Sequence, residues 1–331
     1  MTSSKSGITR RTALATAGAG VLAAGLGARP SFAAMATIRQ GYQTNMWGMP
    51  TYYLLHSGIL KKHGISAEEF AVPSGNLTMQ QMVARQVDLG TFAGPSFAIG
   101  HEKGGLIAIA MIEYVGKTAR VMARKDLGLK KVADLKGKKV ANQTGSSIGN
   151  IFVDQIAPKA GLHKGDYTEV RMNVNDMVAA MAAKTVDAMV DVEPYNAIAE
   201  AEGIANTLVD FYNFDKLPVF MAATPNFVDK NGDTIVAYLK AWLDVAKDFK
   251  NEPDKVADLI YSFYTKKGFK MSKKTFTQAL GRVEVNPGWP NDLGPYMTHH
   301  AEVLKKAGKI SKMPDWNKAF NKSFMKKAES A

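Results

Sequence analysis

The stretch KKVADLKGKKVANQTGSS, residues 130–147, places three elements of an α/β protein next to one another. Lys130 to Leu135 has the spacing of a short amphipathic helical turn, and Lys138 to Asn142 is typical of a short strand. The polar loop Thr144-Gly145-Ser146-Ser147 follows, and we expect a helix from about residue 148 to 160. Gly145 allows a ligand to approach the backbone closely, and the serines offer hydroxyl and N–H donors.

The same alternation of strand and helix extends from this stretch in both directions along the chain. Before it, we expect strands over 37–42, 65–72 and 87–93, with a helix opened by Pro50 and another capped by Asn76. After it, we expect strands over 167–172 and 186–192 around a helix at 175–183, and then helices over 234–250, 253–264, 273–281, 295–307 and 317–327. We expect caps at Asp233 and Ser272. Such alternation predicts parallel sheets covered by helices on both faces.

The composition excludes several classes of protein. A chain of 331 residues with 46% hydrophobic and 22% charged residues forms globular domains, about two at this length. The absence of cysteine excludes disulfides, thiolate metal sites, a cysteine nucleophile and a lipid-anchored lipoprotein. The net charge of +12 is compatible with nucleic acid, an anionic membrane or small anions as partners, and does not choose among them.

The first 33 residues have the organisation of an export signal. A basic region ends in Arg10-Arg11, a weakly apolar stretch runs from Ala13 to Ala28, and Ser31-Phe32-Ala33 places small residues where signal peptidase needs them. The twin arginines favour the twin-arginine route, although an ordinary secretion signal that carries two arginines is the alternative. We therefore expect cleavage near Ala33 and a periplasmic protein.

Several segments, taken in order, resemble a known family of transport proteins. IRQGYQ begins the series, followed by YYLLHSGILKKHGI, MVARQVDLGTFAGPS, VMARKDLGLKKVADLKGKKVANQTGSS and KTVDAMVDVEPY, which together span most of residues 38–195. They resemble the periplasmic solute-binding proteins of ABC importers, in the group that binds nitrate, sulfonates, taurine and thiamine-precursor pyrimidines. Relatives often carry a tryptophan beside the Glu-Pro or Asp-Pro pair, where this chain has Val192.

The resemblance implies an α/β periplasmic-binding-protein fold of type II, with two lobes, two hinge strands and a ligand cleft between the lobes. Lobe one would comprise residues 36–123 plus 224–331, and lobe two residues 124–223. The hinge strands would lie near Ala123 and Ala223. Ligand capture would then be a hinge closure.

Open α/β sheets bind ligands at the carboxyl ends of their strands, and this rule selects the candidate loops. In lobe one, Met46, Trp47 and Met49 follow the first strand and are interpreted as an apolar wall for the ligand, or Trp47 packs under the next helix. Gly94 and Ser96 lie where a strand meets a helix start, which favours an anion, unless Ser96 is merely an N-cap.

In lobe two, the loop Thr144, Gly145, Ser146 and Ser147 repeats this geometry, and in the resembled family it contacts the polar or anionic head of the ligand. A simple capped turn is the alternative. Glu193 is a candidate acceptor for a cationic or amide group, or it orients the hinge or caps the next helix. Tyr195 is a candidate cover for the ligand, and Tyr114 is a further cleft candidate.

The sequence argues against catalysis. It contains no phosphate-binding loop, no zinc-protease motif, no serine-hydrolase elbow and no histidine pair at metal-ligand spacing. Enzymes of the same fold that form the thiamine pyrimidine carry a cysteine-rich motif, which this chain lacks. We therefore expect no enzyme activity, no cofactor and no metal.

We expect a monomer that binds a small molecule and touches the membrane only through its ABC permease, with an ATPase as the further partner. The lysine-rich C-terminal region is interpreted as solvated helix faces, so nucleic acid is not an expected partner. The two helix starts favour a small organic anion, sulfonate- or carboxylate-like. A neutral heterocycle such as a thiamine-precursor pyrimidine remains the alternative, and a pyrimidine-forming enzyme is a remote one. Delivery to a sensor instead of a permease also stays open.

Overall fold

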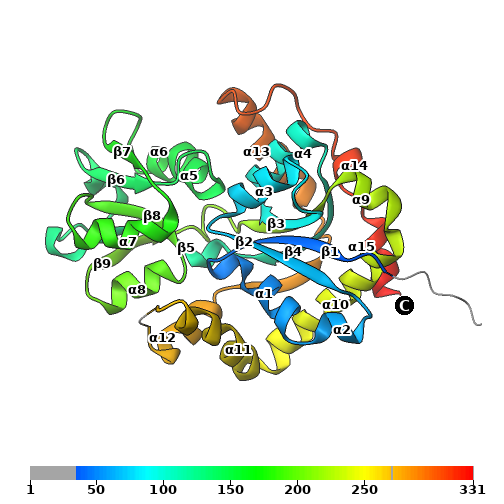
Figure 1. Ribbon diagram of the computed structural model, residues 1–331. Coiled ribbons are helices and arrows are strands. Elements are labelled where there is room, and N and C mark those ends of the chain that lie inside the picture. The colour runs from blue at the N-terminus through cyan, green and yellow to red at the C-terminus, as the bar shows by residue number, and fades with distance from the viewer. Residues whose placement is uncertain (1–34, 270, 331) are drawn as a thin grey trace, which may run out of the picture. The chain divides into compact units, whose positions relative to one another are not determined.

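The computed structural model describes residues 35–269 and 271–330, which contain two mixed β-sheets with helices packed on them (Figure 1). The expected signal peptide, residues 1–33, lies outside the described residues. The α/β architecture predicted from the alternation of strands and helices is confirmed.

The larger sheet has six strands in the order β11-β4-β10-β3-β1-β2. The bounds are β1 (Ile38–Gln43), β2 (Ala67–Val72), β3 (Leu89–Ala93), β4 (Ile107–Tyr114), β10 (Pro218–Ala223) and β11 (Glu284–Gly288). β1 pairs in parallel with β2 and β3, whereas β10 runs antiparallel to both β3 and β4.

Helices cover both faces of this sheet, as Figure 1 shows for α3, α4 and α13 on one face and α1 and α10 on the other. The first group is α3 (Gly75–Val83), α4 (Gly94–Gly104), α13 (Leu293–Lys306) and α14 (Trp316–Ala319). The second is α1 (Met49–His56), α2 (Ile59–Lys62), α9 (Pro225–Lys230), α10 (Gly232–Asn251) and α15 (Ser323–Glu329). α11 (Pro253–Lys266) packs on α1 and α10, and α12 (Lys273–Leu280) packs on α11.

Different side chains hold these two groups of helices to the sheet. On the first face, the rings of Phe97, Phe220 and Phe320 stack with centroids 5.2–5.9 Å apart. On the second face, α10 buries a stripe of residues at helical spacing, and Tyr238 from this stripe donates a hydrogen bond of 2.6 Å to Gln40 of β1.

The smaller sheet has five strands in the order β7-β6-β8-β5-β9. Its strands are β5 (Ala119–Arg124), β6 (Lys139–Asn142), β7 (Thr168–Arg171), β8 (Ala188–Val192) and β9 (Ala205–Asp210). Its helices are α5 (Ser147–Ile151), a π-helical segment (Phe152–Ile156), α6 (Ala157–Lys159), α7 (Val174–Ala182) and α8 (Tyr195–Ala201). The order matches β2-β1-β3-β10-β4 of the larger sheet, since in both orders the fourth strand, β5 or β10, runs antiparallel to both of its neighbours.

The chain passes between the two sheets twice, over residues 115–118 and 211–217. These positions differ from the hinge positions expected near Ala123 and Ala223, which lie inside β5 and β10. Each inserted strand pairs with the sheet it enters directly after the crossing. We propose 35–114 with 218–330 as lobe one and 119–210 as lobe two.

The two crossing segments are hydrogen-bonded to each other. Val115 and Gly116 donate their backbone N–H groups to Leu217 and Lys216 at 3.1 and 2.9 Å. A Cβ atom on Gly116 would lie 2.4 Å from the carbonyl oxygen of Asp215, which is closer than atoms can approach. Glycine at this position therefore allows the two segments to pair.

The observed caps and boundaries of a few helices differ from those expected from the sequence. The helix opened by Pro50 stops at His56, and α2 is separate from it. Ser74 rather than Asn76 precedes α3, and Asp233 lies inside the first turn of α10 instead of capping it. The expected cap at Ser272 is confirmed, since its hydroxyl accepts the N–H of Thr275 at 3.1 Å.

We predict that Gly116→Ala destabilises the protein by about 1–3 kcal/mol, because the added methyl group must push the crossing segments apart. The free energy of unfolding from urea denaturation measures this effect. Gly294→Ala is the matched control, because no atom lies within 4 Å of its Cβ position and α13 gains helix propensity. Equal stability of the wild type and Gly116→Ala would contradict the packing described for the crossings.

Candidate functional site

A small cavity lies where the carboxyl ends of six strands meet, three from each sheet. Its volume is about 20 Å³, and its lining comprises Asn45, Trp47, Ser74, Gly75, Asn76, Ala93 and Ser96 from the larger sheet and Gln143, Ser146, Ser147, Ile148, Val174 and Val192 from the smaller one. Ala93 and Val192 are the last residues of β3 and β8. The other lining residues follow β1, β2 and β3 in the larger sheet and β6 and β7 in the smaller one. The position agrees with the general rule for ligand sites in open α/β sheets.

Four helices begin at this cavity. α3, α4 and α7 have nine, eleven and nine residues, and α5 continues into the π-helical segment. The first N–H groups of a helix lack partners within the helix, and its dipole places positive potential at that end. The cavity therefore lies at the positive ends of four helices, which is a suitable environment for an anionic group.

Serine hydroxyls from both sheets point into the same region. The hydroxyls of Ser96 and Ser147 lie 3.1 Å apart, so one of them donates to the other and joins α4 to α5. Ser74 is 4% exposed, and its hydroxyl has no hydrogen-bond partner within the described residues. Ser146 has a local role, because its hydroxyl accepts the N–H of Gly149 and caps α5. Ser74 and the Ser96–Ser147 pair thus remain as hydroxyl donors for a ligand.

Trp47 and Asn45 form the wall contributed by the loop after β1. Trp47 is buried, and its indole N–H donates to the hydroxyl of Thr118, in the first crossing segment, at 2.5 Å. The Asn45 amide donates to the carbonyl of Pro73 at 3.2 Å and accepts the N–H of Trp47 at 3.0 Å. These bonds fix the loop, so Trp47 both packs in the core and lines the cavity.

The residues that line the cavity carry no formal charge. Recognition of an anion there would rest on N–H groups, hydroxyls and amides, without an arginine or lysine. Across residues 35–269 and 271–330, no group of three or more histidine, aspartate or glutamate side chains is placed to hold a metal ion. In the same residues, no helix has the length and apolar character needed to cross a membrane.

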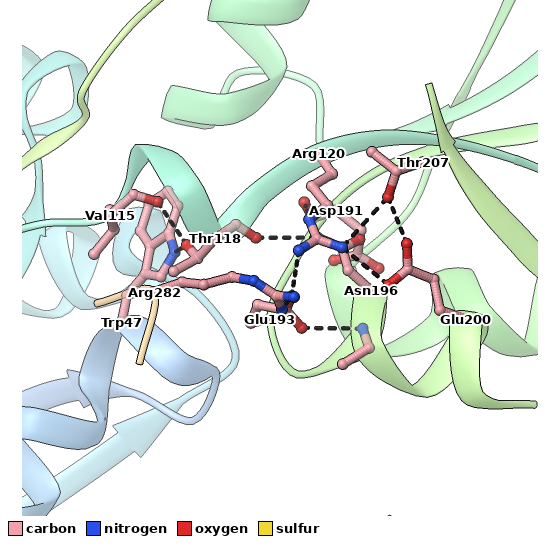
Figure 2. A network of polar contacts seen from close by, with 11 residues as sticks. Trp47, Val115, Thr118, Arg120, Asp191, Glu193, Asn196, Glu200, Thr207 and Arg282 are labelled. Atoms are coloured by element: carbon pink, nitrogen blue, oxygen red, sulfur yellow. Dashed lines mark hydrogen bonds and ion pairs between the residues drawn. The ribbon is translucent and has the colours of Figure 1, made fainter. Parts of the chain in front are cut away.

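Beside the cavity, a buried ion-pair network joins the smaller sheet to the segment before β11. Figure 2 shows Glu193 between two arginines: Arg120, whose Nη2 lies 3.4 Å from Oε1, and Arg282, which donates to the same oxygen. The other carboxylate oxygen accepts the N–H of Ala197 at 3.0 Å. Burial raises the pKa of Glu193, while Arg120 and Arg282 oppose this rise by stabilising the anion.

The sequence-predicted site residues divide into three groups. Trp47, Ser96, Ser146 and Ser147 line the cavity. Thr144 and Gly145 line a larger chamber beside it, and Gly145 has the positive φ of +86° that favours glycine. The others lie elsewhere.

Each residue of the third group has a local packing or pairing role. Met46 and Met49 are fully buried core residues, and Gly94 packs against Tyr296 and Met297. The Glu193 carboxylate is occupied by its own chain and supports the start of α8, as the alternative interpretation held. Tyr195 is buried beside Phe269, and Tyr114 belongs to the aromatic cluster around α13.

Sequence reasoning did not select the other nine lining residues, which are Asn45, Ser74, Gly75, Asn76, Ala93, Gln143, Ile148, Val174 and Val192. Ser74 had an available signal, because Pro73-Ser74-Gly75 directly follows a strand and precedes a helix, as Gly94-Pro95-Ser96 does. The carboxyl-end rule applied to the second strand of each lobe would have selected both Ser74 and Val174.

Comparison with known proteins places this geometry in a family. The model of the family described as "NMT1/THI5 like" matches residues 45–256, which is more than half of the chain. The chain belongs to the NMT1/THI5-like family. The resemblance to periplasmic solute-binding proteins is thereby confirmed.

Individual relatives agree with this assignment. A protein of Brucella abortus (strain 2308) that carries the provisional name of a binding protein is 29% identical over 234 residues, 68% of this chain and 71% of the relative. An Escherichia coli (strain K12) protein with the provisional name of an aliphatic sulfonates-binding protein is 30% identical over 213 residues, 61% of this chain and 63% of its own.

A solved structure is also similar. The alkanesulfonate-binding protein of Xanthomonas axonopodis pv. citri, bound to MOPS, has a TM-score of 0.76 at 18% identity and covers 88% of this chain and 99% of its own. At this identity the likeness shows the fold, which is that of periplasmic binding proteins.

We predict a coupling free energy of about 1–3 kcal/mol between Glu193 and Arg282 in the stability of the protein. Replacing Arg282 leaves the buried carboxylate without a charged donor, and replacing Glu193 leaves the guanidinium without its anion. A double-mutant cycle of Glu193→Gln and Arg282→Met, followed by urea unfolding, measures this coupling.

The exposed pair Lys117–Glu284 is the matched control, since a solvent-exposed ion pair contributes about 0–1 kcal/mol. A coupling between Glu193 and Arg282 no larger than that of the control would contradict the structural role assigned to the network.

Proposed function

We propose that this chain is the substrate-binding component of an ABC importer and captures a small organic anion with a sulfonate- or carboxylate-like head. The observation that carries the proposal is the cavity at which four helix starts and the hydroxyls of Ser74, Ser96 and Ser147 converge. Family membership and the sulfonate-binding names of relatives and structural neighbours support the same ligand class.

The donors suit an oxyanion better than a cation. Helix N-termini stabilise negative charge, and hydroxyl groups donate hydrogen bonds to the oxygen atoms of a sulfonate or a carboxylate. The cavity offers no carboxylate to balance a cation, because Glu193 is outside its lining and pairs with Arg120 and Arg282. A neutral site of this kind binds the anion without the cost of burying a cationic side chain.

The size of the cavity requires the protein to move when a ligand enters. A volume of about 20 Å³ holds about one water molecule, whereas a sulfonate head is larger. We propose that the lobes open about the paired crossings at 115–118 and 211–217, and that the Ser96–Ser147 contact separates on opening. Hinge closure around a ligand is a common device in proteins with two lobes.

We further propose that residues 1–33 direct export by the twin-arginine route and that the mature protein acts in the periplasm as a monomer. It would deliver its ligand to a permease driven by an ATPase, and would itself be neither an enzyme nor dependent on a cofactor. The names of relatives as binding proteins, including a periplasmic binding protein of an ABC transporter in Brachyspira hyodysenteriae (strain ATCC 49526 / WA1), support this assignment.

A neutral heterocycle is the second candidate ligand, and the lack of charge in the lining favours it. Asn45, Asn76 and Gln143 carry amides that suit the ring nitrogens and amino groups of a pyrimidine. Thermal unfolding in the presence of each ligand class distinguishes the two candidates.

Thermal unfolding of the chain against a panel of ligands tests the proposal. The panel comprises taurine, alkyl and aryl sulfonates, nitrate, aromatic carboxylates and aminopyrimidines. A ligand at about 100 times its dissociation constant adds roughly 2.7 kcal/mol of stability, which raises the melting temperature by a few degrees. We expect a rise with sulfonates or carboxylates. A rise with aminopyrimidines alone, or with no member of the panel, would contradict the anion assignment.

We predict that Ser96→Ala weakens binding of the responding anion by about 10- to 100-fold, because a hydroxyl bonded to a charged group is lost. Isothermal titration calorimetry measures the affinity, and the melting temperature without ligand reports any structural damage. Ser262→Ala, a change in α11 outside the cavity lining, is the control and should leave the affinity unchanged. Unchanged affinity in Ser96→Ala would place the ligand elsewhere.

A further inference from the structure

A second, larger chamber adjoins the cavity at Asn76. Its volume is about 510 Å³, within the range of small-molecule sites. Asn76 lines both spaces, and Thr144 and Gly145 of the chamber lie in sequence between Gln143 and Ser146 of the cavity. The two spaces are thus neighbouring compartments, and the chamber extends from the carboxyl ends of β6 and β7 along α3 and α4.

The chamber has an apolar side formed by α3 and α4. Met79, Val83 and Ala84 come from α3 and the residue after it, and Ile99 comes from α4. Met79 and Ile99 are 4% and 7% exposed, so they present fixed side chains. The inner cavity has no room for the body of an organic anion, and this apolar side provides a surface against which such a body can pack.

Three cations complete the lining: Lys103 on α4, Arg171 at the end of β7, and Lys309 after α13. All three side chains are exposed, and the salt bridges formed among the described residues include none of them. No acidic residue lines the chamber. No local pattern groups these cations, because they come from three distant segments of the chain.

The acidic groups nearby are engaged with other partners. Glu102 accepts hydrogen bonds from the N–H and hydroxyl of Ser311, both at 2.6 Å. Glu169 accepts from the hydroxyl of Thr144 at 2.7 Å. Burial raises the pKa of Asp154, while the charges of His300 and Lys309 act in the opposite direction. The chamber therefore keeps a net positive lining.

We propose that the ligand is an organic dianion whose first acidic group occupies the inner cavity and whose second acidic group lies against Lys103, Arg171 and Lys309. The inference rests on the proposed function, because the inner cavity must hold the first anionic head. The apolar side of α3 and α4 accepts the connecting carbon chain. Exposed cations give modest, salt-dependent attraction, so they select a dianion over a monoanion of equal length.

Isothermal titration calorimetry at low ionic strength with two matched ligands tests this proposal. Butane-1-sulfonate carries one charge, and 4-sulfobutanoate carries a sulfonate and a carboxylate on a chain of the same number of carbons. We expect 4-sulfobutanoate to bind about tenfold more tightly, and this advantage to shrink as salt is added.

The variant Lys103→Gln/Arg171→Gln should remove the advantage of 4-sulfobutanoate and leave the affinity for butane-1-sulfonate unchanged. Lys164→Gln/Lys305→Gln, which neutralises two exposed cations outside the chamber, is the matched control. The affinity for butane-1-sulfonate also shows that each variant is folded.

The outcomes separate this proposal from the function on which it rests. Equal affinity of the wild type for both ligands, or equal loss of both in the chamber variant, overturns the dianion proposal and leaves the sulfonate site standing. Failure of both ligands to bind the wild type overturns the proposed sulfonate head, and the dianion proposal with it.

Discussion

The pairing of the two crossing segments is the constraint on which the rest of the structure depends. Residues 115–118 and 211–217 connect the sheets and are hydrogen-bonded to each other through Val115, Gly116, Lys216 and Leu217. Because both connections run side by side, they bring the carboxyl ends of β1–β3 and of β6–β8 to one cavity. A longer side chain at Gly116 would disturb this arrangement before any ligand arrived.

Charge is distributed around the site in a consistent way. The inner cavity relies on helix starts and hydroxyls, so it pays no desolvation cost for a buried cation. The buried carboxylate of Glu193 is neutralised by Arg120 and Arg282 and is kept out of the cavity lining. Of the two compartments, only the outer chamber is lined by cations, and these side chains are exposed to water, which screens their charge. In the proposed function, recognition of a head group and selection of a second charge are thus separated in space.

Much of the fold could be predicted from the sequence, because strand and helix alternate with clear periods from Ile38 to Val192. Ser146 and Ser147 could be found because they stand between a buried strand and a helix. Met46 and Met49 could not be assigned in this way, since an apolar residue in a loop has the pattern of a ligand wall until the packing shows that it belongs to the core.

The remaining features depend on contacts between distant segments. Nothing local to Glu193 indicates that Arg282 will neutralise it, or that Arg171 and Lys309 will line one chamber. The exact crossings were also out of reach, because β5 and β10 look alike as apolar strands whichever sheet they join. Strand order is a tertiary property, and the hydrophobic pattern reports only burial.

Cross-linking across the cavity tests whether the two sheets present their helix starts to each other. The chain has no cysteine, so Ser96→Cys/Ser147→Cys introduces the only two thiols, at positions whose hydroxyls lie 3.1 Å apart. A disulfide needs a sulfur–sulfur distance of about 2.05 Å, which a small closing movement provides. We expect mild oxidation to remove both thiols and to block ligand binding until a reductant is added, whereas Ser96→Cys/Ser262→Cys should not cross-link within the molecule. Two thiols that stay reactive after oxidation in the folded Ser96→Cys/Ser147→Cys protein would contradict this expectation.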